Sequence, residues 1–302
     1  MCQMLFKTNI FGLVGSENNP EYKQNQVIIW DDKTKSVLCK YTIKETVLNL
    51  KLRRDRIVVV CHSKIYVLNL KNFDIVDNIE TGPNPNGLVG ISYIESKYIL
   101  VYPSKDKENH LTIKHSDTKK FIYISPDKNK IAYITLSYNG LLLATSSEEG
   151  KKIRIFETES GEFLQELNRG QEKADIKCIS IDFKNQFVAA SSERGTIHIW
   201  SLAQSIEKIK KSGKIAILEE EKNFKISNVG SMFAVLPSFL GGGYFKNEWS
   251  FAQVRLDEPY SIFHFGAENS LIIITSTGKY YKTKIDLQKG GECQILQEED
   301  LF

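Results

Sequence analysis

Paired cysteines, metal-binding histidine patterns and long apolar runs are all missing from this 302-residue sequence. The five cysteines are scattered and odd in number, with no CxxC pair, which indicates reduced thiols and no structural metal. No apolar run approaches the ~18–20 residues that cross a bilayer. The N-terminus lacks the basic start and the cleavage site of a signal peptide. We therefore expect a cytoplasmic protein whose contacts with membranes are peripheral.

An excess of charge of one sign is also absent. The chain carries 40 Lys and Arg against 37 Asp and Glu, a net charge of +3, so no overall field favours nucleic acid as a partner. Neither an HExxH pattern nor a nucleophile elbow occurs, and Gly241–Gly243 is not part of a phosphate loop. We expect no enzymatic activity, no cofactor and no metal, and any anion site has to be local.

The sequence does contain many short β-branched and aromatic runs between turns, and these runs repeat. Leu141–Leu167 and Phe187–Glu207 share one plan: a strand ending in Ser-Ser-Glu, a glycine turn, and a strand ending in an aromatic residue. A strand repeat of ~40 residues is typical of β-propeller blades. The sequence predicts an all-β chain of about six blades with one short helix or ordered loop at Leu202–Lys211. The predicted blades span residues 3–44, 45–82, 87–125, 130–168, 174–226 and 248–286.

The most informative polar residues lie where the fourth unit passes to the fifth. Arg169 ends the fourth unit, and Ser192, Thr196 and His198 lie on the next hairpin, where Thr196 and His198 share one side of a strand. An arginine fork, two hydroxyls and an imidazole suit a phosphorylated ring. The alternative is that the hydroxyls cap a turn and the histidine satisfies a hydrogen bond within the blade.

Long segments of the chain resemble the PROPPIN family, the phosphoinositide-binding WD-repeat β-propellers of autophagy. LNRG at Leu167–Gly170 looks like a variant of the family's [LF]RRG motif. The resemblance continues through NNPEYKQNQVIIWDD, IETGPNPNGL, ATSSEEGKKIRIF and SSERGTIHIW. It implies one WD-repeat β-propeller domain over residues 1–302. Because the family has seven blades and begins with a further one, it also implies that the first blade is missing here.

By this resemblance two phosphoinositide sites flank the blade junction. The intact site consists of Arg169, Ser192, Thr196 and His198. The second site is eroded, because Asn168 replaces its arginine and Lys151 its threonine, while Ser147 and Arg154 remain. We expect one working site rather than two.

The segment Asn228–Asn247 matches the position of the family's membrane-inserting loop. Apolar side chains surround a triple glycine there and are predicted to enter the bilayer: Phe233, Leu236, Phe239, Leu240, Tyr244 and Phe245. Burying such side chains would supply the second signal that stable membrane residence needs. The alternative is a surface insertion with a few side chains tucked against a blade.

The function implied by the resemblance is that of a peripheral membrane effector. The chain would bind phosphatidylinositol 3-phosphate and phosphatidylinositol 3,5-bisphosphate on phagophore and endosomal or vacuolar membranes. It would recruit factors for autophagosome formation, with autophagy proteins such as the lipid-transfer machinery bound through the early blades. The alternative is a propeller scaffold for protein–protein interaction with weak or lost lipid binding.

Overall fold

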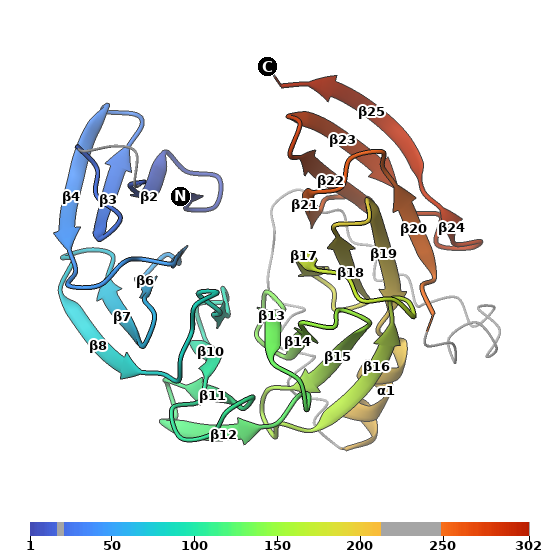
Figure 1. The fold of residues 1–302 in the computed structure, drawn as a ribbon, viewed down its shortest axis with the longest axis horizontal. Coiled ribbons are helices and arrows are strands. Elements are labelled where there is room, and N and C mark those ends of the chain that lie inside the picture. The colour runs from blue at the N-terminus through green and yellow to red at the C-terminus, as the bar shows by residue number, and fades with distance from the viewer. Residues whose placement is uncertain (17–20, 213–248, 302) are drawn as a thin grey trace. The chain divides into compact units, whose positions relative to one another are not determined.

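The computed structural model describes residues 1–16, 21–212 and 249–301, which belong to two compact units, Met1–Lys128 and Asn129–Phe302. Nearly all of the regular structure in these residues is β-strand, in six sheets whose strands mostly follow one another in chain order (Figure 1). Antiparallel neighbours joined by tight turns bring each sheet together locally, as the repeat of short strands predicts. The all-β prediction is confirmed.

The first unit contains three four-stranded antiparallel sheets. The first consists of β1 (Cys2–Met4), β2 (Ile10–Val14), β3 (Gln26–Asp31) and β4 (Ser36–Thr42). The second consists of β5 (Asn49–Leu52), β6 (Arg56–Val60), β7 (Lys64–Asn69) and β8 (Ile75–Glu80). The third consists of β9 (Gly90–Ile91), β10 (Ile99–Pro103), β11 (Leu111–His115) and β12 (Lys120–Ile124).

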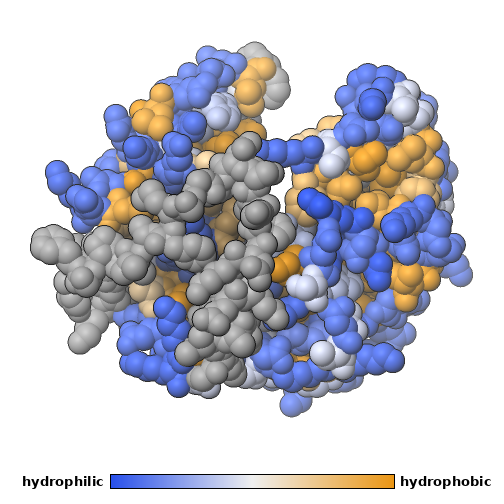
Figure 2. Space-filling view, turned by 180° about the vertical axis from the view of Figure 1, so that it is seen from behind, coloured by the Kyte–Doolittle hydropathy of each residue, from blue (hydrophilic) through white to orange (hydrophobic). Residues whose placement is uncertain are grey.

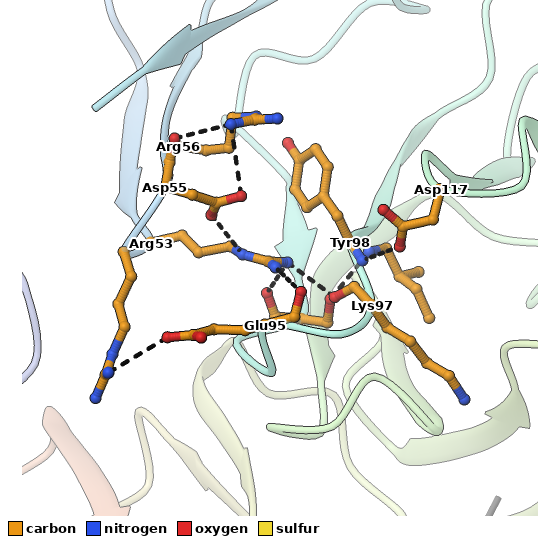
Figure 3. A network of polar contacts seen from close by, with 10 residues as sticks. Arg53, Asp55, Arg56, Glu95, Lys97, Tyr98 and Asp117 are labelled. Carbon is orange, nitrogen blue, oxygen red and sulfur yellow. Dashed lines mark hydrogen bonds and ion pairs between the residues drawn. The ribbon is translucent and has the colours of Figure 1, made fainter. Parts of the chain in front are cut away.

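A buried arginine fastens the second sheet to the third (Figure 3). Arg53, in the β5–β6 turn, is 2% exposed and donates to the backbone oxygens of Ser92, Glu95 and Lys97 at 2.8–3.3 Å. Its Nε lies 2.7 Å from the Asp55 carboxylate. A buried guanidinium is tolerated only when its N–H groups find acceptors. Here three backbone oxygens of the β9–β10 loop accept from Arg53. Arg53 therefore links neighbouring sheets through its side chain.

The outer strand of each of these three sheets carries apolar side chains that stay exposed. An outer strand also leaves a row of backbone N–H and C=O groups unpaired, which makes it a template for a further strand. On the face drawn in Figure 2, hydrophobic patches interrupt a mostly hydrophilic surface. The exposed apolar pairs are Val37 and Leu38 on β4, Ile75 and Val76 on β8, and Phe121 and Tyr123 on β12.

The second unit contains the other three sheets. The fourth sheet consists of β13 (Ile131–Leu136), β14 (Leu142–Ser147), β15 (Lys152–Glu157) and β16 (Phe163–Asn168). The fifth consists of β17 (Ile176–Ile181), β18 (Phe187–Ser192), β19 (Thr196–Ser201), β20 (Ala252–Arg255) and β24 (Gly291–Glu292). The sixth consists of β21 (Ser261–Phe265), β22 (Ser270–Thr275), β23 (Lys279–Lys284) and β25 (Gln294–Asp300).

Glycines close the two repeated Ser-Ser-Glu turns of this unit. Gly150 and Gly195 have φ of +59° and +76°, a region that favours glycine. A Cβ at Gly150 would lie 1.8 Å from the Ala174 oxygen, and one at Gly195 would lie 2.5 Å from the Leu256 oxygen. Both turns therefore approach neighbouring backbone closely, which fixes where the strands after them begin.

The predicted limits of the fifth and sixth blades are wrong. We expected the fifth unit to end at residue 226, but its fourth strand is β20, which pairs with β19 from beyond the long segment that follows α1 (Ala203–Lys211). The sixth sheet then ends with β25 instead of at residue 286. Strand pairing over such a separation leaves no local signal, and β25 is exposed along its length. Of the two alternatives for Leu202–Lys211, a short helix or an ordered loop, the structure has the helix α1.

Candidate functional site

The residues of the predicted intact site lie on one face of the fifth sheet. Ser192 ends β18 and Thr196 begins β19, so the glycine turn places their side chains together. His198 follows two positions later on the same face, because side chains alternate along a strand. The intervening Ile197 and Ile199 pack into the core on the opposite face. Strand alternation thus places three polar side chains together at the start of β19, next to the buried Ala190 and Trp200 of the same face.

Arg169, in the connection between the fourth and fifth sheets, is near enough to this face for its charge to lower the pKa of His198. Its Nε donates to the backbone oxygen of Gly150 at 2.7 Å, and an Nη donates to the backbone oxygen of Glu172. The residue is 7% exposed, and burial lowers the pKa of its guanidinium, with repulsion from Arg194 adding to the effect. Arg169 is therefore both a cation at the site and a brace between two loops.

His198 is a neutral imidazole in this environment. Its ring stacks on Trp200 at a centroid distance of 5.7 Å, and Nδ1 shares a hydrogen bond of 3.2 Å with the Ser250 hydroxyl. Burial, together with the charges of Arg169 and Arg255, lowers the pKa of His198 to about 4. At neutral pH the ring therefore contributes hydrogen bonding and no charge.

Arg255 is a cation of this face that the sequence did not reveal. It pairs with Thr196 in the β19–β20 register, while Gln253 pairs with His198, so all four side chains project from one face. The Arg255 side chain is 70% exposed, and its Nε lies 3.8 Å from the Glu292 carboxylate. We had assigned this strand to the sixth blade, so nothing placed its arginine beside Thr196.

The predicted eroded site is neutralised by carboxylates of the chain itself. Arg154 Nε donates to Glu166 at 2.8 Å, and Lys152 bonds the same carboxylate. Lys151 lies 3.2 Å from Glu149. Burial raises the pKa of the Glu166 carboxyl, but the hydrogen bonds from Lys152 and Arg154 outweigh burial and hold the pKa below its ordinary value. These cations are therefore compensated within the fourth sheet.

The other two residues of that predicted site lie on the strands around this cluster. Asn168 pairs with Lys152 in the β15–β16 register, and Ser147 is buried at the end of β14. Alternation along β16 places Glu166 on the same face as Asn168. Asn168 and Arg154 therefore share one face of the fourth sheet with Glu166, a carboxylate that the family motif does not include.

The predicted membrane-inserting segment lies outside the described residues, as do the side chains assigned to it: Phe233, Leu236, Phe239, Leu240, Tyr244 and Phe245. The helix before it, α1, packs on the outer strand of the fourth sheet. Lys208 of α1 donates to the Leu164 oxygen and lies over the Phe163 ring at 5.7 Å. These contacts hold α1 against β16.

Within the described residues no helix is long and apolar enough to span a bilayer. In the same parts of the chain no three His, Cys, Asp or Glu side chains gather as metal ligands. Chemically, the face of the fifth sheet offers guanidinium, hydroxyl and imidazole groups, which are the kinds of donor that hold phosphate oxygens. The assignment of these residues to a lipid site stays a prediction.

Comparison with known proteins gives concordant results. The PROPPIN family model matches residues 3–302. The chain is 33% identical to Autophagy-related protein 18e of Arabidopsis thaliana, over 100% of this chain and 76% of that protein. It is 26% identical to WD repeat domain phosphoinositide-interacting protein 1 of Homo sapiens, over 93% of this chain and 63% of that protein.

Solved structures agree with the fold. The complex of KlAtg21 with the coiled coil of AgAtg16 superposes with a TM-score of 0.78 at 20% identity, over 100% of this chain and 85% of that chain. Hsv2 of Kluyveromyces lactis superposes with a TM-score of 0.74 at 19% identity, over 100% and 86%. The predicted fold class, a β-propeller with about six blades in this chain, is confirmed.

Proposed function

The chain belongs to the PROPPIN family, and from this premise we propose that it is a peripheral membrane protein of autophagy that binds phosphoinositides. The proposed ligands are phosphatidylinositol 3-phosphate and phosphatidylinositol 3,5-bisphosphate. The proposed role is non-enzymatic, because the protein would retain a lipid without changing it. Its human relative is named for phosphoinositide interaction and its Arabidopsis relative for autophagy, which supports both halves of the proposal.

One observation carries the lipid half: Ser192, Thr196 and His198 share one face of the fifth sheet, and Arg169 is near enough for its charge to act on His198. A guanidinium binds phosphate with charge-assisted hydrogen bonds. Hydroxyls and a neutral imidazole add donors that do not repel the cation. This combination suits a phosphomonoester on a polyol ring better than a bare carboxylate, because a ring also presents hydroxyls to neutral partners.

The partner half of the proposal places autophagy proteins, such as the lipid-transfer machinery, on the early blades. The unpaired outer edges of β4, β8 and β12 and their exposed apolar side chains support it, since an extended peptide can add to such an edge. We propose phagophore and endosomal or vacuolar membranes as the sites of action. The loop Asn228–Asn247 is proposed to add membrane insertion to headgroup binding.

A second candidate function is a scaffold that binds proteins and has weak or lost lipid affinity. The compensated cluster around Glu166 favours this candidate, because Arg154 and Lys152 already bond a carboxylate. Arg169 also donates to two backbone oxygens, which leaves fewer of its N–H groups for a ligand. The two candidates differ in whether the face of the fifth sheet binds a phosphorylated headgroup.

Flotation on phosphatidylcholine vesicles separates the candidates. The lipid effector should float only when the vesicles contain phosphatidylinositol 3-phosphate, and Arg169→Ala should abolish flotation. Arg54→Ala is the control, because Arg54 is an exposed arginine of the first unit paired with Glu95. Equal recovery of the wild type on vesicles with and without the 3-phosphate lipid would favour the scaffold.

A further inference from the structure

The exposed arginine on β20 is placed to act on any ligand of the fifth-sheet face. Arg255 and Thr196 are direct partners in the β19–β20 register, and directly opposed side chains in an antiparallel pair have Cβ atoms about 5 Å apart. A ligand that accepts a hydrogen bond from the Thr196 hydroxyl therefore lies within the reach of the Arg255 side chain. The effect of Arg255 on the pKa of His198 agrees with this closeness.

The arginines near this face differ in how firmly they are held. Arg169 is buried and braced by the Gly150 and Glu172 oxygens. Arg194 bonds the Glu172 carboxylate and the Lys173 oxygen. Arg255 projects into solvent, with its Nε 3.8 Å from Glu292. Arg255 can therefore reorient toward a ligand without breaking a buried contact.

Glu292 is arranged to compete for that guanidinium. One carboxylate oxygen accepts the Arg255 backbone N–H at 2.9 Å, and the other faces the side chain. Strand β24, which carries Glu292, pairs with β20 and fixes this position. An exposed ion pair is weak because water screens both charges, whereas a doubly charged phosphate can accept two parallel bonds from one guanidinium. A phosphate should therefore displace the carboxylate.

We propose that Arg255 contacts a phosphate of the ligand bound on the fifth-sheet face, and that Glu292 holds the guanidinium only until a phosphate replaces it. The ligand class is a ring with at least two phosphates: one meets Arg169 and the hydroxyls, and the other meets Arg255. This inference rests on the proposed function, since it assumes a phosphorylated ligand at that face. The same chemistry occurs in a lipid headgroup and in a soluble inositol phosphate.

The test is calorimetric titration with inositol 1,3-bisphosphate, in parallel with flotation on vesicles containing phosphatidylinositol 3-phosphate. Arg255→Gln should weaken binding about tenfold in both assays, the loss of one charge-assisted contact. Glu292→Gln should strengthen it about threefold, because the amide oxygen still accepts the Arg255 N–H while the competing charge is gone. In the Arg255→Gln background, the gain from Glu292→Gln should disappear.

Arg54 and Glu95 supply matched controls. They form an exposed pair at 3.3 Å in the first unit, so Arg54→Gln and Glu95→Gln make the same charge changes away from the site. Both should bind like the wild type, and thermal melts should show that all variants fold.

Four outcomes would count against the assignment or its premise. Unchanged binding by Arg255→Gln would overturn the assignment, and so would a loss confined to vesicles, which would place Arg255 against bulk lipid phosphate. A gain from Glu292→Gln that persists without Arg255 would overturn the exchange. If the wild type bound neither inositol 1,3-bisphosphate nor vesicles containing phosphatidylinositol 3-phosphate, the proposed function itself would be refuted, and the inference with it.

Discussion

At the proposed site, His198 is expected to make headgroup affinity rise as the pH falls. In the free protein, burial and the charges of Arg169 and Arg255 lower the pKa of the ring to about 4 from its ordinary 6.5. A phosphate bound beside the ring supplies negative charge, which favours the imidazolium and raises the pKa again. Binding is then accompanied by proton uptake, so affinity rises as pH falls through the bound-state pKa.

The size of the effect follows from the two pKa values. If binding restores the ordinary 6.5, the affinity gain between pH 7 and pH 5 is about twentyfold, and it levels off only below pH 4. The stability of the free protein changes with pH in the direction opposite to the affinity. Because the folded-state pKa is the lower one, stability is fully present above the unfolded value and declines as pH falls from 6.5 toward 4.

The assay is titration of inositol 1,3-bisphosphate at pH 7, 6 and 5 with the wild type and His198→Gln. The phosphates also lose charge near pH 6, but this affects both proteins equally, so the ratio of their affinities isolates the ring. The affinity of the wild type divided by that of His198→Gln should rise as the pH falls. A ratio that stays constant across the range would show that the imidazole is not protonated on binding, and that it lies too far from the phosphates to sense them.

Arg169→Ala is expected to weaken headgroup affinity by ~1.5–3 kcal/mol, and Asn168→Ala to change it little; equal losses in calorimetry would mean that the site is misassigned. Arg53→Met should lower the free energy of unfolding by about 3–5 kcal/mol, because three carbonyls lose their buried partner, whereas the exposed Arg54→Met costs under about 1 kcal/mol. Similar urea midpoints for these two variants would contradict the linking role of Arg53. A variant in which Ser replaces four apolar side chains of the loop should lose flotation and keep headgroup binding. The four side chains are Phe239, Leu240, Tyr244 and Phe245. Unchanged flotation with a lower melting temperature would identify them as core residues.

Local patterns in the sequence were sufficient to predict the strands, the glycine turns and the clustering of Ser192, Thr196 and His198. Each of these depends on residues a few positions apart, through alternation along a strand and the geometry of one turn. The brace formed by Arg169 was not predictable, because its partners are backbone oxygens that any sequence would offer. Its place at the junction before the hairpin of Ser192 and Thr196 followed from the order of the repeated units.

The rest of the site depends on pairings that leave no local pattern. Arg255 lies beside Thr196 only because β20 returns to β19, and the polar strand β25 lacks the alternation that marks a half-buried strand. Glu166 could have been found, since it lies two positions before Asn168 on a predicted strand and must share its face. The family motif marks the arginine that Asn168 replaces, and it does not include the carboxylate of Glu166.

The placement of β20 has a consequence for folding. Strand β19 ends at Ser201 and β20 begins at Ala252, so the chain must close a loop of roughly 50 residues before these strands pair, against about 5 in a common hairpin. Loop-closure entropy grows with the logarithm of length, which makes this pairing about 2 kcal/mol more costly than a short hairpin. Strand β20 should therefore be among the last to join its sheet and the first to leave it. The proposed Arg255 contact would form only after the rest of that face is in place, and a bound ligand would stabilise the pairing that the long connection weakens.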